Sequence, residues 1–129
     1  FKQKTAYEIT DRSRGLGDVY KRQVDEVPVF DFVLLGVGED GHTSSVFPDR
    51  KDLLTAAEPY AVSVNPYNKT VRICMTGKPM IEAKHTCFLV AGENKCSILK
   101  KILDKEQEDI YPASYIWHHA RMPKLYASL

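Results

Sequence analysis

Residues 36–43, Gly-Val-Gly-Glu-Asp-Gly-His-Thr, place carboxylate and imidazole side chains among three glycines in one short segment. They follow a largely apolar run, residues 30–35, which is typical of a strand buried on both faces. The small hydroxyl residues after the glycines could open a helix, so we expect a strand–turn–helix junction here. Because ligands of open α/β sheets bind beyond the carboxyl ends of the strands, Asp40 and His42 are predicted to face a substrate.

Two nucleotide-binding patterns share this spacing, and the charges of the segment disfavour both. The three glycines fit G-x-G-x-x-G, the dinucleotide fingerprint, but Glu39 and Asp40 would repel the pyrophosphate that this turn binds. The P-loop spacing also fits, yet His42 stands where the phosphate-binding lysine belongs. We therefore predict neither a dinucleotide site nor an NTPase.

A longer pattern is more specific. Residues 36–48, Gly-Val-Gly-Glu-Asp-Gly-His-Thr-Ser-Ser-Val-Phe-Pro, closely resemble the signature G-x-G-x-D-G-H-T-A-S-x-F-P of 6-phosphogluconolactonases. Glucosamine-6-phosphate deaminases share its first half but carry a catalytic Glu five residues after the His, where this chain has Phe47. The resemblance thus favours a lactonase over a deaminase or isomerase of sugar phosphates. It implies hydrolysis of 6-phospho-D-glucono-1,5-lactone to 6-phosphogluconate in the oxidative pentose phosphate pathway, without an organic cofactor.

The resemblance also implies a fold. This is a three-layer α/β fold with a mostly parallel sheet, of the modified Rossmann-like type found in deaminases and ribose-phosphate isomerases. The motif lies in the middle of longer chains in that family, so residues 27–129 are expected to be the carboxyl-terminal part of a lactonase domain, an incomplete fragment. Residues 1–26 are polar without a sustained period. They read as a basic tail or as a translated sequencing-adapter artefact, and we leave them out of the fold prediction.

Water attack on an ester carbonyl needs a base whose pKa lies near neutrality. On the loop, only His42 has such an unperturbed value, so His42 is the predicted general base. Asp40 is predicted to orient the imidazole or to stabilise its charged form, although it could instead cap a following helix. Backbone N–H groups of the glycine turn could stabilise the oxyanion, and Gly38, Gly41 and Thr43 are the predicted substrate contacts of the loop.

Two basic residues are candidates for holding the phosphate. From spacing alone, Arg72 within residues 70–76 and Lys95 after residues 86–91 are ordinary surface charges. The first segment, however, resembles the lactonase strand R-[IV]-[TC]-[LM]-T, and Gly-Glu-Asn-Lys resembles the family's G-E-x-K element. The resemblance implies that both residues bind the sugar phosphate. We expect adjacent strands of one parallel sheet to bring them to one rim, with Asn94 capping the helix that contains Lys95.

Further elements follow from hydrophobic periodicity. A short helix is expected within residues 44–54, interrupted or begun anew at Pro48, and a proline-opened helix after residue 76. Residues 60–64, 70–76 and 86–91 are expected strands. Apolar positions 98, 99, 102 and 103 form one stripe of a helix. Residues 111–116 resemble the family's P-A-S segment, which leads to a last strand. Adjacent His118 and His119 would point apart in a strand, and we predict no metal site.

Composition limits the remaining possibilities. The 129 residues are 43% hydrophobic, enough for one domain at most. With 18 basic and 17 acidic residues, the chain has no long-range field to attract nucleic acid or an anionic membrane. The number of cysteines is odd, so we expect free thiols. Because the chain has no apolar run of about 18–20 residues and no leader, we expect a cytosolic protein. A glucosamine-6-phosphate deaminase or isomerase-like enzyme and a non-catalytic sugar-phosphate-binding fragment stay open as alternatives to the lactonase, and the oligomeric state is not predicted.

Overall fold

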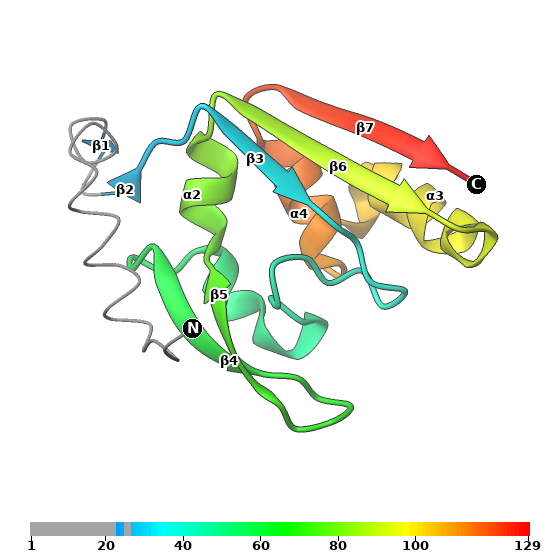
Figure 1. Cartoon of the computed structure of the whole chain (residues 1–129), viewed down its shortest axis with the longest axis horizontal. Coiled ribbons are helices and arrows are strands. Elements are labelled where there is room, and N and C mark those ends of the chain that lie inside the picture. Colours follow the sequence, from blue (N-terminus) through cyan, green and yellow to red (C-terminus); the bar gives the residue numbers. More distant parts are fainter. Residues whose placement is uncertain (1–22, 25–26) are drawn as a thin grey trace, which may run out of the picture.

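Three parallel strands form the sheet that positions the glycine loop (Figure 1). They are β3 (Phe32–Leu35), β6 (His85–Ala91) and β7 (Pro123–Ser128), in the order β3-β6-β7, and both pairings are parallel. These strands come from a computed structural model that describes residues 23–24 and 27–129. The predicted α/β class and parallel sheet are confirmed, as is the strand expected within residues 86–91.

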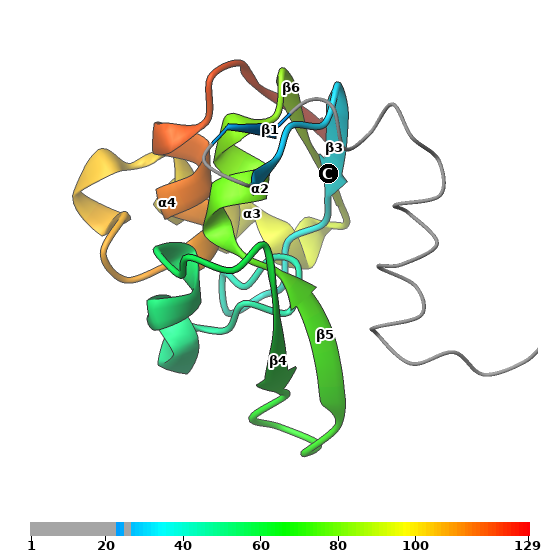
Figure 2. The same cartoon turned by 90° about the vertical axis from the view of Figure 1, so that its left-hand side faces the viewer.

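The described helices lie on one side of this sheet (Figure 2). They are α2 (Gly77–Glu82), α3 (Cys96–Leu103) and α4 (Pro112–His119). Alternate strand residues face them and are buried, and the helices contribute buried apolar residues to the same core: Val33, Leu35, Phe88, Val90, Met80, Ile98, Ile102 and Ile116. On the opposite face, Phe32, Leu34, Leu89 and Tyr126 are each more than half exposed. The described residues therefore supply the sheet and one helical layer of the predicted three.

A second pair of strands is separate from the parallel sheet. β4 (Tyr60–Val64) and β5 (Val71–Met75) form an antiparallel hairpin, with Ser63 opposite Arg72. Both strands were predicted, but placing the strand of Arg72 in the parallel sheet was wrong. The physical reason is the connection, because residues 65–70 form a tight turn and a parallel pairing needs a crossover of a dozen or more residues. The backbone N–H groups of Asn65 and Lys69 close this turn on the carbonyls of Thr70 and Asn65, both at 2.9 Å.

The segment after the glycine loop differs from the expected helix. Residues Pro48–Leu54 form a 3-10 helix, η1, which begins at Pro48 as one of the expected possibilities. Ser44 and Ser45 do not open it, because their φ angles of 51° and 58° lie in the left-handed region. The predicted strand–turn–helix junction is thus a strand, a turn of unusual backbone and a delayed 3-10 helix.

The carboxyl-terminal part also corrects the prediction. Pro112 begins α4 in its first turn, where a missing N–H costs nothing. His118 and His119 therefore end a helix, whereas we expected a strand, and the last strand is β7 beyond them. The other short elements are β1 (Gln23–Val24), β2 (Val27–Pro28) and the 3-10 turns η2 (Glu93–Lys95) and η3 (Lys105–Gln107). Apart from residues 23–24, the predicted leader lies outside the described residues.

Candidate active site

Residues 36–43 fold back on themselves directly after β3. The N–H of Gly41 donates to the carbonyl of Gly38 at 3.0 Å, and the N–H of Gly38 donates to the carbonyl of His42 at 2.9 Å. The hydroxyl of Thr43, a residue only 1% exposed, donates to the carbonyl of Gly36 at 2.8 Å. These bonds close the loop at its base, so Thr43 has a structural contact here and its predicted role toward substrate stays a prediction.

Asp40 and His42 form a close pair at the tip of the loop. Oδ1 of Asp40 lies 2.5 Å from Nδ1 of His42 and accepts the backbone N–H of His42 at 3.1 Å. The two side chains are 18% and 33% exposed respectively, so the pair is partly shielded yet reachable. Nε2 of His42 makes no hydrogen bond to any described residue. The structure thus brings together the two predicted catalytic residues and leaves one imidazole nitrogen open.

The environment of Asp40 keeps its carboxylate charged. Partial burial raises the pKa of Asp40, but hydrogen bonds from the Tyr67 hydroxyl and from His42 outweigh this effect and hold the pKa below its usual range. The Tyr67 hydroxyl donates to Oδ2 of Asp40 at 2.7 Å. A negative charge therefore stands beside the imidazole at neutral pH, where it would stabilise an imidazolium.

Two glycines of the loop have steric reasons for lacking a side chain. A Cβ on Gly38 would lie 2.1 Å from the imidazole of His42. Gly41 has a φ of +82°, and a Cβ there would lie 2.6 Å from the ring of Tyr111. The carbonyl of Gly41 also accepts the N–H of Ala113 at 2.9 Å, which joins the loop to the first turn of α4. The glycines thus allow the imidazole and α4 to approach the loop closely.

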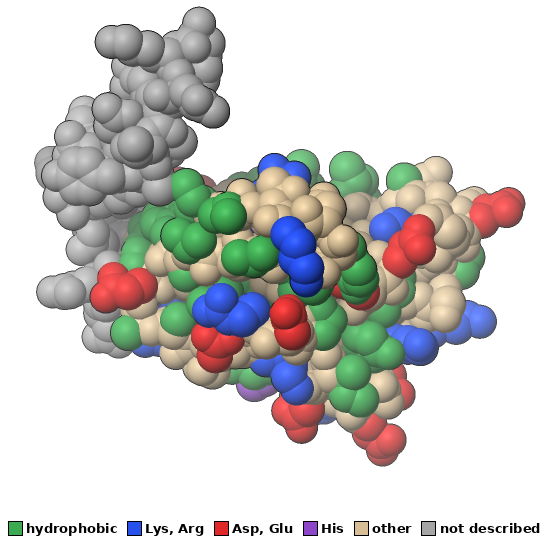
Figure 3. All heavy atoms as spheres, turned by 90° about the horizontal axis from the view of Figure 1, so that it is seen from below, with side chains coloured by type: hydrophobic (Ala, Val, Ile, Leu, Met, Phe, Trp, Pro, Cys, Tyr) green, Lys and Arg blue, Asp and Glu red, His purple; other side chains and the backbone are tan. Residues whose placement is uncertain are grey.

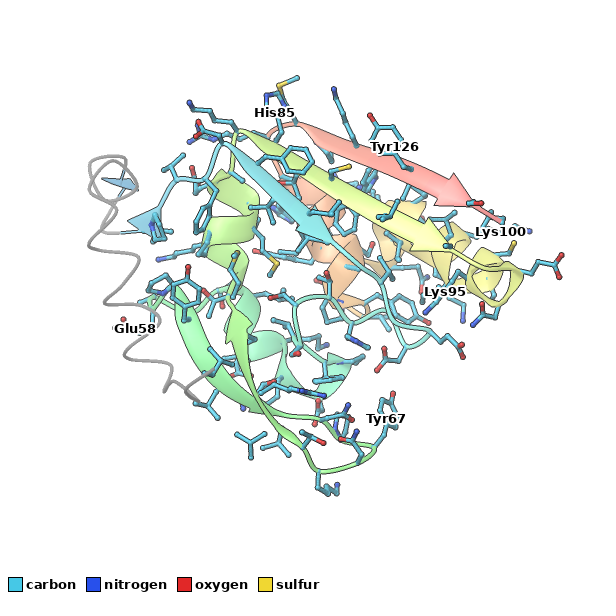
Figure 4. The ribbon with its side chains drawn as sticks, in the orientation of Figure 1. Glu58, Tyr67, His85, Lys95, Lys100 and Tyr126 are labelled. Atoms are coloured by element: carbon cyan, nitrogen blue, oxygen red, sulfur yellow. The ribbon has the colours of Figure 1, made fainter. Side chains whose placement is uncertain are left out.

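The two predicted phosphate ligands are placed differently. Nζ of Lys95 donates to the carbonyl of Val37 at 2.9 Å, so this ammonium lies against the loop (Figure 4). Arg72 is exposed on β5, and its guanidinium makes no hydrogen bond or ion pair to a described residue. It shares a hairpin face with its strand partner Ser63, whose hydroxyl donates to the carbonyl of Ser45 at 2.6 Å. The expectation that both residues lie on one rim of the parallel sheet was wrong.

Asn94 is not the N-cap residue of α3, so this prediction was wrong. Lys95 occupies the N-cap position of α3 and is also the last residue of η2. The side-chain amide of Asn94 instead donates to the carboxylate of Glu39 on the glycine loop. The segment after β6 therefore contacts the loop through both Asn94 and Lys95.

Residues 2–125 match the family model described as "Glucosamine-6-phosphate isomerases/6-phosphogluconolactonase". The chain belongs to this family. The match begins well before residue 27, where the motif resemblance starts, and the division at residues 26 and 27 stays a prediction.

Individual relatives agree with this family. The chain is 38% identical over 98 residues to 6-phosphogluconolactonase of Homo sapiens and 42% identical over 96 residues to that of Bos taurus. These alignments cover 75% and 73% of this chain but only 38% and 37% of the relatives. A solved structure named devB protein is 31% identical, with a TM-score of 0.81 over 98% of this chain and 53% of its own. The chain thus spans about two fifths to a half of the proteins that it matches.

Phe47 occupies the position where the pattern of glucosamine-6-phosphate deaminases has a Glu. It is buried, and its ring centroid lies 4.5 Å from that of His42. An apolar ring packed against the imidazole cannot exchange protons. At this position the chain therefore has an apolar residue in place of an acidic one.

Sequence reasoning missed the contacts that the hairpin makes with the loop. Tyr67 lies in the Asn-Pro-Tyr-Asn turn, which we interpreted only as a turn signal. The hydroxyl of Ser44 accepts the backbone N–H of Met75 at 3.0 Å, a second contact from the hairpin. An aromatic residue with a hydrogen-bonding group at the tip of a hairpin was the available signal, but its target could not be deduced without the fold.

Three properties of the described part of the chain concern metals, membranes and surface charge. No three His, Cys, Asp or Glu side chains gather there in a metal-binding arrangement, and Nε2 of His119 faces Glu108 at 3.3 Å. No described helix has the length and apolar composition needed to cross a bilayer. On the side seen in Figure 3, basic and acidic side chains are interspersed rather than gathered into one basic surface.

Proposed function

We propose that this chain carries the catalytic loop of a 6-phosphogluconolactonase, which hydrolyses 6-phospho-D-glucono-1,5-lactone to 6-phosphogluconate. The observation that carries the proposal is the pair formed by Asp40 and His42, with Nδ1 engaged at 2.5 Å and Nε2 open. Family membership and the names of the human and bovine relatives support the same substrate. The reaction belongs to the oxidative pentose phosphate pathway, and we propose a cytoplasmic location for it.

His42 acts as the general base in this proposal. Nε2 removes a proton from a water molecule as the water oxygen forms a bond to the lactone carbonyl carbon. Asp40 holds the proton of Nδ1 and stabilises the imidazolium that results. When the bond between the carbonyl carbon and the ring oxygen breaks, the imidazolium returns its proton to that oxygen. The product is the open-chain acid, and His42 is again neutral.

The oxyanion needs hydrogen-bond donors on the same loop. The N–H groups of Gly38, Gly41 and His42 are already engaged within the loop. The N–H groups of Glu39 and Asp40 make no hydrogen bond to a described residue. We assign the oxyanion contact to these two amides, while Gly38 and Gly41 contribute by letting the substrate approach the backbone.

The phosphate is held at a distance from the reacting carbonyl. Lys95 uses one of its three ammonium protons on Val37, so two remain for phosphate oxygens. Arg72 offers a guanidinium fork that suits a phosphate. Binding energy at this remote group positions the lactone ring over His42.

The test is turnover of the phosphorylated lactone, followed with 6-phosphogluconate dehydrogenase as the coupling enzyme. We expect hydrolysis above the spontaneous rate, and His42→Ala should lower the enzyme-dependent rate by roughly 10²–10⁴-fold. His85→Ala is the matched control, because His85 is an exposed histidine at the start of β6. Binding of a phosphate ligand without turnover would favour the non-catalytic alternative.

A further inference from the structure

The tip of the β4–β5 hairpin reaches the carboxylate of Asp40. The Tyr67 hydroxyl donates to Oδ2 at 2.7 Å, while Oδ1 accepts from Nδ1 and from the backbone N–H of His42. We propose that Tyr67 is a positioning residue, which holds Asp40 so that Asp40 holds His42. This inference rests on the proposed role of His42 as general base, and it adds to that role a residue that lies 25 positions away in the sequence.

A carboxylate held by one oxygen can turn about its last side-chain bond, because the preference for this torsion is broad. With both oxygens engaged, Oδ1 of Asp40 stays opposite Nδ1 of His42. Nδ1 then keeps the proton, and the lone pair of Nε2 faces the open side of the site. Tyr67 therefore fixes which imidazole nitrogen can accept a proton from water.

Tyr67 is itself fixed although its residue is 69% exposed. Its backbone N–H donates to the side-chain oxygen of Asn65 at 2.8 Å, a local bond that shapes the hairpin turn. Its ring and the ring of Phe47 are in an edge-to-face arrangement with centroids 6.4 Å apart, and Phe47 packs in turn on His42. Figure 4 shows Tyr67 between the hairpin tip and the loop. Contacts of its backbone N–H, its ring and its hydroxyl thus hold Tyr67 in place.

The rest of the hairpin is fastened to the same loop. Ser63 donates to the carbonyl of Ser45 at 2.6 Å, and Met75 donates its N–H to the hydroxyl of Ser44 at 3.0 Å. Ser44 and Ser45 have left-handed backbone conformations, which cost energy and need support from neighbouring residues. Met75 lies at the base of the hairpin and Ser63 near its turn, so these two contacts hold the hairpin to the loop along its length and keep its tip near Asp40. The hydrogen bond also raises the pKa of Tyr67, because a phenolate would face the carboxylate.

The first experiment is a double-mutant cycle on lactone hydrolysis. Tyr67→Phe should lower kcat about 3- to 10-fold and leave KM unchanged, since Tyr67 acts on the imidazole and not on the substrate. In an Asp40→Asn background, Tyr67→Phe should have no further effect. Tyr126→Phe is the matched control, because Tyr126 is 58% exposed on β7 and its hydroxyl has no hydrogen bond to a described residue. An equal loss of kcat in both backgrounds, or a change in KM alone, would overturn the proposal.

The second experiment does not depend on turnover. In the chain labelled with ¹⁵N-histidine, Tyr67→Phe should shift the ring-nitrogen resonances of His42 toward a mixture of the two tautomers, and Tyr126→Phe should not. If lactone hydrolysis is absent, the proposed function fails, but these resonances still decide the role of Tyr67. A His42 spectrum that Tyr67→Phe leaves unchanged would rule that role out.

Discussion

The two ends of the candidate site are built in different ways. At the proposed catalytic end, Oδ1 of Asp40 and Nδ1 of His42, two positions apart in one loop, lie 2.5 Å from each other. At the proposed phosphate end, Lys95 follows a strand of the parallel sheet, whereas Arg72 lies on the separate hairpin. The difference shows that a site within one short segment follows from local sequence, while a site shared between elements depends on how the chain connects them.

Of the effects expected at the two ends when His42 itself is kept, the larger one tests the local end. Gly38→Ala would place a Cβ 2.1 Å from the imidazole, and the imidazole can swing away more readily than the backbone can move. We expect the fold to survive and lactone hydrolysis to fall by about 10²-fold, because a displacement of this order at a catalytic group has that cost. The measurement is kcat together with the thermal unfolding midpoint.

Gly36→Ala is the control for this prediction. A Cβ at Gly36 meets nothing within 4 Å, so this variant makes the same chemical change on the same loop without displacing His42. Near-normal kcat in both variants would show that the imidazole position in the structure is not the one used in catalysis.

A smaller effect tests the shared end. Lys95→Ala should weaken capture of the phosphorylated lactone by about 1.5–3 kcal/mol, the range for a hydrogen bond to a charged group. Arg72→Ala should cost less, because Lys95 lies against the loop, whereas the guanidinium of Arg72 has no hydrogen bond or ion pair to a described residue. The measurement is kcat/KM for each variant, with Lys100→Ala on the exposed side of α3 as control.

The same variants decide whether the two residues share one phosphate. If they do, the double mutant should be non-additive, and both losses should shrink for a lactone that lacks the 6-phosphate. Should Lys95→Ala and Arg72→Ala behave like the unchanged chain, the phosphate end inferred from the resemblance is wrong even if His42 is the base.

Much of the fold was predictable because its signals are local. The apolar run before the loop gave β3, and the stripe that includes Ile98 and Ile102 gave α3. The pairing of β5 was not predicted, because strand propensity does not say which neighbour a strand joins, although the short turn after Val64 contained that information. The delay of η1 to Pro48 depends on left-handed backbones at Ser44 and Ser45, which the hairpin supports and local propensity disfavours.

In the candidate site too, some residues were predictable from local sequence and others depend on the fold. Asp40 and His42 could be assigned to one loop from spacing and chemistry, and Lys95 could be assigned to its neighbourhood only through the family resemblance. Tyr67 could not be found, because its hydroxyl meets Asp40 across 27 positions and two separate sheets. What sequence reasoning lacked was therefore the docking of the hairpin, and not the chemistry of its residues.

The smallest expected effect concerns acid stability and tests the contact between hairpin and loop without any substrate. The pKa of Asp40 is lower in the folded chain than the ordinary value of an aspartate, because hydrogen bonds from Tyr67 and His42 outweigh the effect of partial burial, which raises it. A carboxyl whose folded pKa is lowered adds stability that is present above the unfolded pKa and disappears as the pH falls through the folded pKa. Asp40→Asn should therefore make the free energy of unfolding less dependent on pH below about 4. Urea unfolding between pH 6 and pH 3 measures this, with Asp109→Asn as the control on an exposed carboxylate. If both variants change the acid slope equally, Asp40 is an ordinary surface carboxylate, and the hydrogen bond that joins the hairpin to the loop does not persist in solution.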